Sequence, residues 1–208
     1  EAVERFRILK SRYPYSKYAA LAALKIGDAH FQEESYLEAA SAYKVFRELY
    51  PKHEMAPYAL YRTGESYLNE MPSSVDRDLD PAHSAIEAYE QLLRDYPNDE
   101  HAKDAKKKSH DLKRKLAEKE DYVANFYWRR ELYQAAAGRY AFIVENYGDF
   151  GLNRDSLYRL AFCYERMGEY RKAADALTRL DNEFPEGREG KDRKKLWTLI
   201  NAGLEKPE

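Results

Sequence analysis

The sequence has almost no cysteine, since Cys163 is the single one among 208 residues. One cysteine cannot form an internal disulfide or a multi-cysteine metal site, and we expect it to be a small buried hydrophobic residue. No apolar run reaches the roughly 18 residues that a membrane-spanning helix needs. No basic segment followed by an apolar one opens the chain, so targeting information is absent from these residues.

Sequence patterns of catalytic and metal sites are also lacking. Neither of the glycine-rich phosphate-binding patterns G-x-G-x-x-G and G-x-x-x-x-G-K-[ST] occurs, and no serine nucleophile elbow is present. His53 and Glu54 begin like a zinc-binding helix, but Pro57 stands where the second histidine would be needed. His30 lies three and four residues before two glutamates, and with no further ligand in sight we expect a solvated helix end. The sequence therefore predicts no enzyme, no metal and no cofactor.

Turn-forming residues are scarce and tyrosine is abundant. The chain contains nine glycines and eight prolines against 19 tyrosines, which favours helices over a turn-rich β fold. Its 35 basic and 37 acidic residues nearly balance, so the net charge does not indicate a function.

A helical pattern recurs five times along the chain. Each copy ends with an aromatic residue followed by a terminator, has a bulky residue eight positions before the terminator, and has an alanine twelve positions before it. Residues at such spacings lie on one helical face, where the small alanine lets a neighbouring helix approach. The terminators are Pro14, Pro51, Pro97, Gly148 and Pro185; the alanines are Ala2, Ala39, Ala85, Ala136 and Ala173; the bulky residues are Phe6, Tyr43, Tyr89, Tyr140 and Leu177.

A partner helix precedes two of these copies. Gly27 and His30 lie upstream of Ala39, and Ala161 and Tyr164 lie upstream of Ala173. The spacings resemble the tetratricopeptide repeat (TPR), which combines two antiparallel helices in each repeat. The predicted fold is therefore all-α, a TPR superhelix of antiparallel helix pairs with one extended middle helix.

We expect a single TPR-like domain over 1–208 that begins inside a truncated repeat. The terminators are spaced by 37, 46, 51 and 37 residues, so the two middle repeats carry extra residues. The first excess is a polar loop, and the second predicts one continuous helix over 99–130, where glycine and proline are absent. The predicted segments are a second helix at 1–14, repeats at 15–51, 52–97, 98–148 and 149–185, and a C-terminal capping helix at 186–208.

Several motifs between residues 75 and 147 indicate one particular family among the TPR proteins. In order they are an acid–arginine–acid insertion, the helix end "LLRDYPN", the run "LAEKE", the aromatic "VANFYWRR" and an alanine-rich turn that reaches Arg139. Together they resemble the BamD family, TPR lipoproteins of the bacterial machinery that assembles outer-membrane β-barrels. Two residues depart from the family pattern: Glu131 stands where a glycine is usual, and Gly148 replaces a proline.

The resemblance implies a non-enzymatic scaffold in the periplasm, held by a lipid anchor at the inner leaflet of the outer membrane. It implies as partners BamA, the lipoproteins BamC and BamE, and unfolded outer-membrane proteins. The expected contacts with a BamA-like domain are Arg139, Tyr133, Asp76, Arg77 and Asp78. Inward-facing positions of the early repeats predict a peptide groove formed by Lys25, Asp28, Tyr58, Tyr61, Arg62 and Glu65.

Three other binding functions remain open. A different periplasmic TPR scaffold, such as the Tol-associated CpoB, would share the repeats but should lack the long helix. A chaperone adaptor would need a carboxylate clamp of lysine and asparagine, where this chain has Leu24 with Asp28 and Tyr61 with Glu65. Nucleic-acid binding would use the basic run between Lys106 and Lys115, although acidic residues dilute it.

For Arg139 itself, the alternative to a partner contact is an exposed arginine that pairs with Glu145 or with nothing. For the tyrosines of the groove, the alternative is a role in packing between repeats. For the C-terminus, Leu196, Trp197 and Ile200 at helical spacing favour a capping helix.

Overall fold

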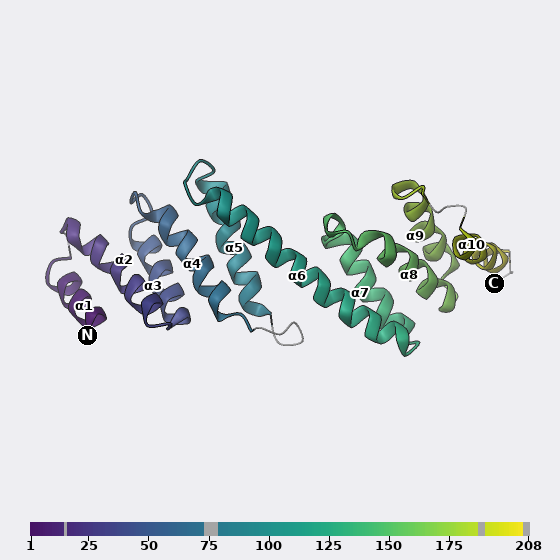
Figure 1. Ribbon diagram of the computed structural model, residues 1–208, viewed down its shortest axis with the longest axis horizontal. Helices are drawn as coiled ribbons and strands as arrows, with labels where there is room; N and C mark the ends of the chain where they lie inside the picture. The colour runs from purple at the N-terminus through teal and green to yellow at the C-terminus, as the bar shows by residue number, and fades with distance from the viewer. Residues whose placement is uncertain (15, 73–78, 187–189, 206–208) are drawn as a thin grey trace. The chain divides into compact units, whose positions relative to one another are not determined.

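The computed structural model describes residues 1–14, 16–72, 79–186 and 190–205, with the backbone alone at Lys17 (Figure 1). Over these ranges the chain forms ten α-helices, one 3-10 turn and no strand. It divides into two compact units, Glu1–Lys113 and Arg114–Glu208, and helix α6 (Ala102–Arg129) contributes residues to both.

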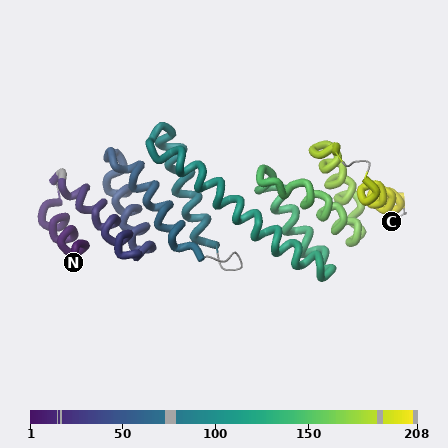
Figure 2. Tube along the Cα trace, viewed as in Figure 1, coloured from purple at the N-terminus to yellow at the C-terminus, as the bar shows by residue number. Residues whose placement is uncertain are grey.

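The N-terminal unit consists of helices that pack in chain order. They are α1 (Ala2–Arg12), α2 (Lys17–Gln32), α3 (Tyr36–Leu49), α4 (Ala56–Glu70), α5 (Asp80–Asp95) and the first part of α6. From α1 to α5, each helix packs against the next, as the successive turns of the trace show in Figure 2. One apolar cluster of this unit contains Tyr43 and Phe46 of α3 against Leu24 of α2.

The C-terminal unit continues in the same way. After the last part of α6 come α7 (Tyr133–Asn146), the 3-10 turn η1 (Gly148–Phe150), α8 (Asn153–Arg166), α9 (Tyr170–Glu183) and α10 (Lys191–Leu204). Helix α8 packs between α7 and α9, and α10 packs on α9 and α8. The predicted all-α fold, with the helix-pair packing of a TPR superhelix, is confirmed.

The five repeated helices end at the predicted residues. Each C-cap is the aromatic residue before a terminator, with φ between −132° and −138°. A residue that precedes proline is sterically excluded from helical geometry, which explains four of these ends. The C-caps are Tyr13, Tyr50, Tyr96, Tyr147 and Phe184.

The repeated face is buried in the four copies that follow the first. Ala39, Ala85, Ala136 and Ala173 are fully buried, and so are the bulky residues of the same four copies. Helix α1 has no buried residue, although its sequence carries the same pattern. Cys163 is fully buried in α8, as predicted, and burial raises the pKa of its thiol to about 12.

Helix α6 runs without a break through Ser109 and Glu120, which confirms the predicted continuity. Its predicted start at residue 99 is wrong by three residues. The Asp99 carboxylate accepts a hydrogen bond from the His101 backbone N–H at 2.9 Å, and the Asp99 carbonyl accepts one from Ala102 at 3.0 Å. Residues 99–101 thus form a separate turn that precedes the helix, and α6 begins at Ala102.

Three of the turns that join two helices of a pair each contain one residue in the left-handed backbone conformation. Glu34, Glu131 and Gly168 have φ values of 57°, 59° and 75°. Each turn closes with a hydrogen bond to a carbonyl five residues back, as from Leu132 to Tyr127 at 3.1 Å. This pattern is a Schellman motif, in which glycine is preferred because it has no Cβ.

Replacing Glu131 with glycine is expected to raise the free energy of unfolding by about 1 kcal/mol, because it relieves the left-handed strain of a side-chain-bearing residue. Urea denaturation followed by circular dichroism measures the change. The matched control is Glu118→Gly, at an exposed position inside α6, which should lower stability by a similar amount, about 1 kcal/mol. A Glu131→Gly protein no more stable than the parent would contradict the prediction.

Candidate functional site

A hydrogen-bonded cluster centred on Asp28 lies on helices α2 to α4. The Asp28 carboxylate accepts hydrogen bonds from the hydroxyl groups of Tyr43 and Tyr58 at 2.7 and 3.0 Å. Lys25 Nζ is 2.8 Å from its other oxygen. Arg62 Nε donates to the Tyr43 hydroxyl at 3.4 Å, so the cluster also receives a cation from α4.

A second cluster, centred on Glu65, links α4 to α5 and to the start of α6. Glu65 accepts a hydrogen bond from the Tyr89 hydroxyl, and its Oε1 atom is 2.7 Å from Lys108 Nζ. Lys108 Nζ also donates to the Tyr61 hydroxyl at 2.8 Å, while that hydroxyl donates to Asp104 at 2.6 Å. These groups form one continuous network.

A third cluster repeats the arrangement inside the C-terminal unit. The Tyr140 hydroxyl donates to Asn125 Oδ1 at 2.9 Å and accepts a hydrogen bond from Arg159 Nη1 at 3.1 Å. In all three clusters the cation lies 19 residues after the buried tyrosine, since the pairs are Arg62 with Tyr43, Lys108 with Tyr89, and Arg159 with Tyr140. The recurrence at 19 residues is a sequence signal that periodicity within single helices misses.

The buried tyrosines and Lys108 of these networks have raised pKa values, so they keep their protons at neutral pH. Burial raises the pKa of Tyr43 and Tyr89 and raises the pKa of Tyr140 to about 12. Burial lowers the pKa of Lys108, but hydrogen bonds to Asp104, Glu65 and Tyr61 outweigh it and raise the pKa above its ordinary value. At neutral pH the tyrosines therefore stay neutral and the lysine stays charged, an arrangement suited to fixed binding contacts.

The structure brings the six residues predicted for the peptide groove together within the N-terminal unit. Lys25 is exposed and the other five are half-buried. Their side chains also hold the helices together: Tyr61 stacks on His101 with ring centroids 4.4 Å apart, and the Arg62 guanidinium lies 3.6 Å from the centroid of the Phe31 ring. The hydroxyl groups of Tyr58 and Tyr61 already donate hydrogen bonds within the protein.

Arg139 lies on α7 beside α6. Its Nη1 atom is 2.9 Å from Glu120 Oε2, and the arginine side chain is 47% exposed while the glutamate is 17% exposed. The partner is therefore Glu120 and not Glu145, the residue named in the alternative interpretation. At the neighbouring Gly138 a Cβ atom would meet nothing within 4 Å, so the surface beside the arginine is open.

Tyr133, which was also predicted to contact a BamA-like domain, does not lie in a cluster with Arg139. Tyr133 lies at the start of α7 and packs edge-on against Phe162 of α8, with ring centroids 6.0 Å apart. It contacts a different helix from Arg139 and forms no common cluster with it. Asp76, Arg77 and Asp78 lie outside the described residues.

An aromatic cluster around Phe162 was not predicted. The Trp128 ring centroid is 6.1 Å from that of Phe162, and the guanidinium groups of Arg159 and Arg166 lie 5.0 and 4.9 Å from the Trp128 and Phe162 centroids. These residues come from α6 and α8, which no local sequence pattern relates. Cation–π contacts of this kind stabilise the packing of arginine on aromatic rings.

The basic run of α6 is partly used inside the protein. Lys108 pairs with Glu65, and Lys113 Nζ is 2.5 Å from Glu90 Oε1. Fewer cations of the run remain for phosphate groups than the sequence suggests. In the described part of the chain no group of three or more potential ligands could hold a metal ion, and no helix there is both long and apolar enough to cross a membrane.

Stacked helix pairs joined by buried tyrosine networks define a helical-repeat protein, a class that binds other proteins along the faces of its helices. The chain belongs to the YfiO family, described as outer membrane lipoprotein, whose profile matches residues 1–180. This match confirms the resemblance inferred from the motifs.

Known relatives agree with the family assignment. The outer membrane protein assembly factor BamD of Neisseria meningitidis serogroup A is 33% identical over 193 residues, which cover 88% of this chain and 72% of the relative. BamD of Vibrio cholerae is 30% identical over 176 residues, covering 80% and 73%. BamD of Caulobacter vibrioides is 30% identical over 185 residues, covering 89% and 60%.

Proposed function

We propose that this chain is a non-enzymatic scaffold in the assembly of β-barrel proteins of the outer membrane. It acts in the periplasm, anchored by lipid to the inner leaflet of the outer membrane, with BamA and the lipoproteins BamC and BamE as partners. The observation that carries the proposal is the match to relatives named outer membrane protein assembly factor BamD over 88% of the chain. The helical-repeat architecture supports it, because repeats of this class present extended binding faces.

The contact with a BamA-like periplasmic domain centres on Arg139. Its ion pair with Glu120 is half-exposed, and surface pairs of this kind are worth only about 0–1 kcal/mol, so a partner carboxylate could replace Glu120 at little cost. An arginine can then bind that carboxylate through two parallel hydrogen bonds. The open surface at Gly138 leaves room for the partner.

The test of this contact is a binding titration of Arg139→Glu against the periplasmic repeats of the cognate BamA. We expect the affinity to fall at least about tenfold, which corresponds to about 1.4 kcal/mol. The matched control is Arg171→Glu, an exposed arginine on α9 of the same unit, which should bind as the parent does. Circular dichroism checks the fold of both variants, and unchanged affinity of a folded Arg139→Glu protein would refute the contact.

Unfolded outer-membrane proteins bind along the groove of the N-terminal unit. Tyr58 and Tyr61 offer large aromatic area at low entropic cost, and Lys25 adds an exposed cation beside them. Because their hydroxyls are already hydrogen-bonded, recognition would depend on the rings and not on the hydroxyl groups.

Replacing Tyr58 and Tyr61 with alanine is therefore expected to reduce crosslinking to unfolded barrel peptides severalfold, whereas replacing both with phenylalanine should preserve most of it. The control Tyr122→Ala removes a tyrosine that is 62% exposed in the C-terminal unit. A folded double alanine variant that crosslinks as well as the parent would exclude this groove.

A further inference from the structure

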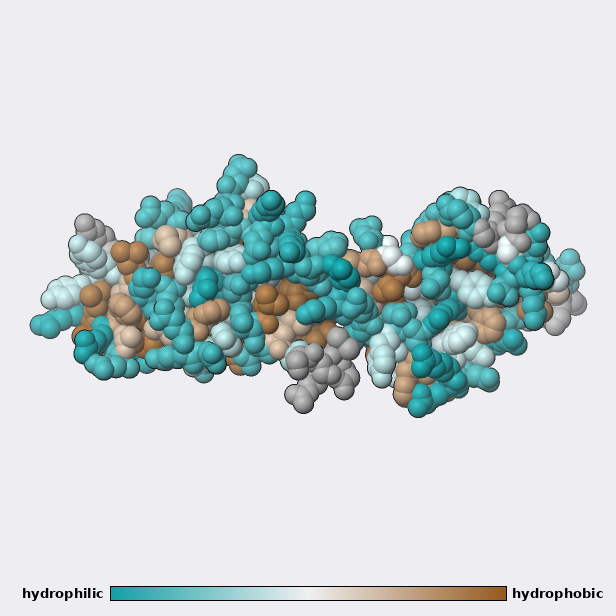
Figure 3. All heavy atoms as spheres, viewed as in Figure 1, coloured by the Kyte–Doolittle hydropathy of each residue, from teal (hydrophilic) through white to brown (hydrophobic). Residues whose placement is uncertain are grey.

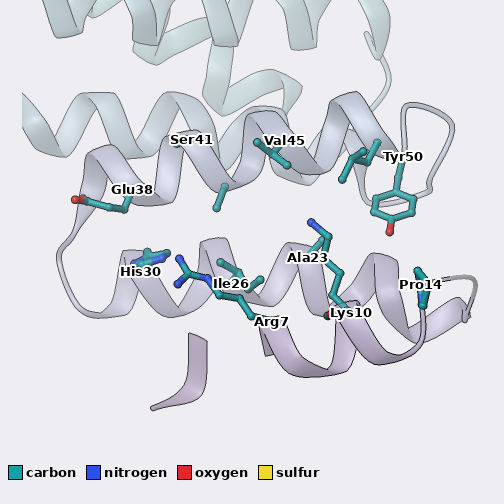
Figure 4. A pocket seen from close by; sticks show the side chains of 13 residues that line it. Arg7, Lys10, Pro14, Ala23, Ile26, His30, Glu38, Ser41, Val45 and Tyr50 are labelled. Carbon is teal, nitrogen blue, oxygen red and sulfur yellow. The ribbon is translucent and has the colours of Figure 1, made fainter. Parts of the chain in front are cut away.

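A groove of about 710 Å³ lies among α1, α2 and α3, away from the polar clusters described above (Figure 4). Arg7 and Lys10 of α1 lie on one wall and Val45 of α3 lies on the other. Leu49 of α3 also lines the groove. Ile26 of α2 lies at the base between the two walls. Figure 3 shows hydrophobic residues emerging between hydrophilic ones over these first helices.

The corresponding groove of the next repeat is bridged. Between α3 and α5, Arg47 Nη1 donates to Gln91 Oε1 at 3.2 Å. Counted back from the terminator prolines, Arg47 corresponds to Lys10 and Gln91 corresponds to Val45. Since valine has no hydrogen-bond acceptor in its side chain, the pair that bridges the second groove cannot form in the first.

A third groove of the same kind lies among α7, α8 and α9 and holds about 250 Å³. Arg179 of α9 occupies the position that corresponds to Val45 and helps to line it. The groove beside α1 is thus almost three times larger than its counterpart in the C-terminal unit. At this repeat position the large groove has a short apolar residue, whereas the other two repeats have glutamine or arginine.

The charges of the large groove are unbalanced along the α1 wall. Among the residues that the structure describes, Arg7 and Lys10 have no acidic partner and no hydrogen-bond acceptor. Glu38 of α3 and His30 of α2 also line the groove, and Figure 4 shows the Arg7 side chain extending toward His30. Within the described part of the chain, the groove therefore presents two cations without an acidic partner beside apolar side chains.

We propose that this groove docks an acidic amphipathic helix of a partner protein. The lining positions on α3 run from Glu38 to Leu49, a length of about 16 Å at 1.5 Å per residue, or about three helical turns. A docked helix would place apolar side chains against Val45 and Leu49 and would direct flanking carboxylates to Arg7 and Lys10.

The backbone of the helices that line the groove favours a helical occupant over an extended one. All three walls are helices whose backbone groups are already hydrogen-bonded, so an extended strand would find no partners there for its own N–H and C=O groups. A helix satisfies these groups internally. This docking surface does not depend on the assembly role proposed above.

The test uses two labelled designed peptides of 15 residues and fluorescence anisotropy. One carries a leucine stripe flanked by glutamates, and the other has lysine at every glutamate position. We expect the intact chain to bind the acidic peptide at least tenfold more tightly than the basic one. A third peptide, the acidic sequence interrupted by two prolines, should bind at least tenfold more weakly than the acidic helix.

Two variants examine the groove itself. The double substitution Lys10→Arg with Val45→Gln recreates the Arg47–Gln91 pair at the same repeat positions, and it should close the groove and weaken acidic-peptide binding at least tenfold while the fold is kept. Arg7→Glu with Lys10→Glu should reverse the preference between the two peptides. Lys52→Glu, at an exposed lysine outside the lining, is the control that should leave binding unchanged.

Three results would overturn the proposal. They are equal binding by the closed-groove variant with an unchanged circular dichroism spectrum, tighter binding of the basic peptide by the parent chain, and equal binding of the proline-interrupted peptide. The last would indicate an extended occupant or non-specific apolar adhesion.

Discussion

Replacing Asp181 with alanine is expected to lower the free energy of unfolding of the C-terminal unit by about 3–5 kcal/mol, the usual result of removing one partner from a buried ion pair. Asp181 Oδ1 is 3.1 Å from Arg193 Nη1, and the two side chains are 4% and 7% exposed. The other oxygen accepts a hydrogen bond from Trp197 Nε1 at 2.9 Å. Both partners come from α10, so this carboxylate fastens the last helix to α9.

Without the carboxylate, Arg193 would remain charged in a buried place, held by the Phe184 carbonyl at 2.8 Å. The control is Asp175→Ala, an exposed aspartate on the same helix, where the change should stay within about 0.5 kcal/mol. Hydrogen exchange of α10 amides and urea denaturation measure the effect. A loss no larger than that of the control would contradict the prediction.

Replacing Gly64 with alanine is expected to cost about 3 kcal/mol, at the upper end of the range for overpacked cores. A Cβ atom at Gly64 would lie within 2.7 Å of Cδ1 and Cζ of the Tyr89 ring. That ring is fully buried, and its hydroxyl is hydrogen-bonded to Glu65, so it cannot move away freely.

The second substitution Tyr89→Leu should restore part of the stability of the Gly64→Ala protein. The chain itself combines Ala161 with Leu177 at the corresponding repeat positions, and both are fully buried. Thermal unfolding of the single and double variants provides the test. If the leucine added no stability in the alanine background, a clash with the tyrosine ring would not be the cause of the loss.

The two predicted binding surfaces differ in how well sequence reasoning located them. The six groove residues lie at helical spacing on α2 and α4, so their shared surface followed from the period of the helix. The hydrogen-bond partners of these residues could not be inferred from that period, because Asp104 and Lys108 come from a helix that begins more than thirty residues further along the chain. For Arg139, the predicted contact with a partner domain stays a prediction, and only the alternative interpretation named an intramolecular partner. That partner was Glu145, which is nearer along the chain, whereas the structure pairs Arg139 with Glu120.

By itself the sequence determined where the repeated helices end and, in the four copies after the first, which residues they bury. Tyr50 before Pro51 and Tyr96 before Pro97 stop helices through local sterics, and alternating small and large residues such as Ala39 and Tyr43 define a packing face, since both effects act within a few residues. Tertiary structure decided the three polar clusters around Tyr43, Tyr89 and Tyr140, the ion pair of Arg139 and the open groove beside α1. Their atoms come from helices separated along the chain, and it is the packing of those helices that sets the distances between them.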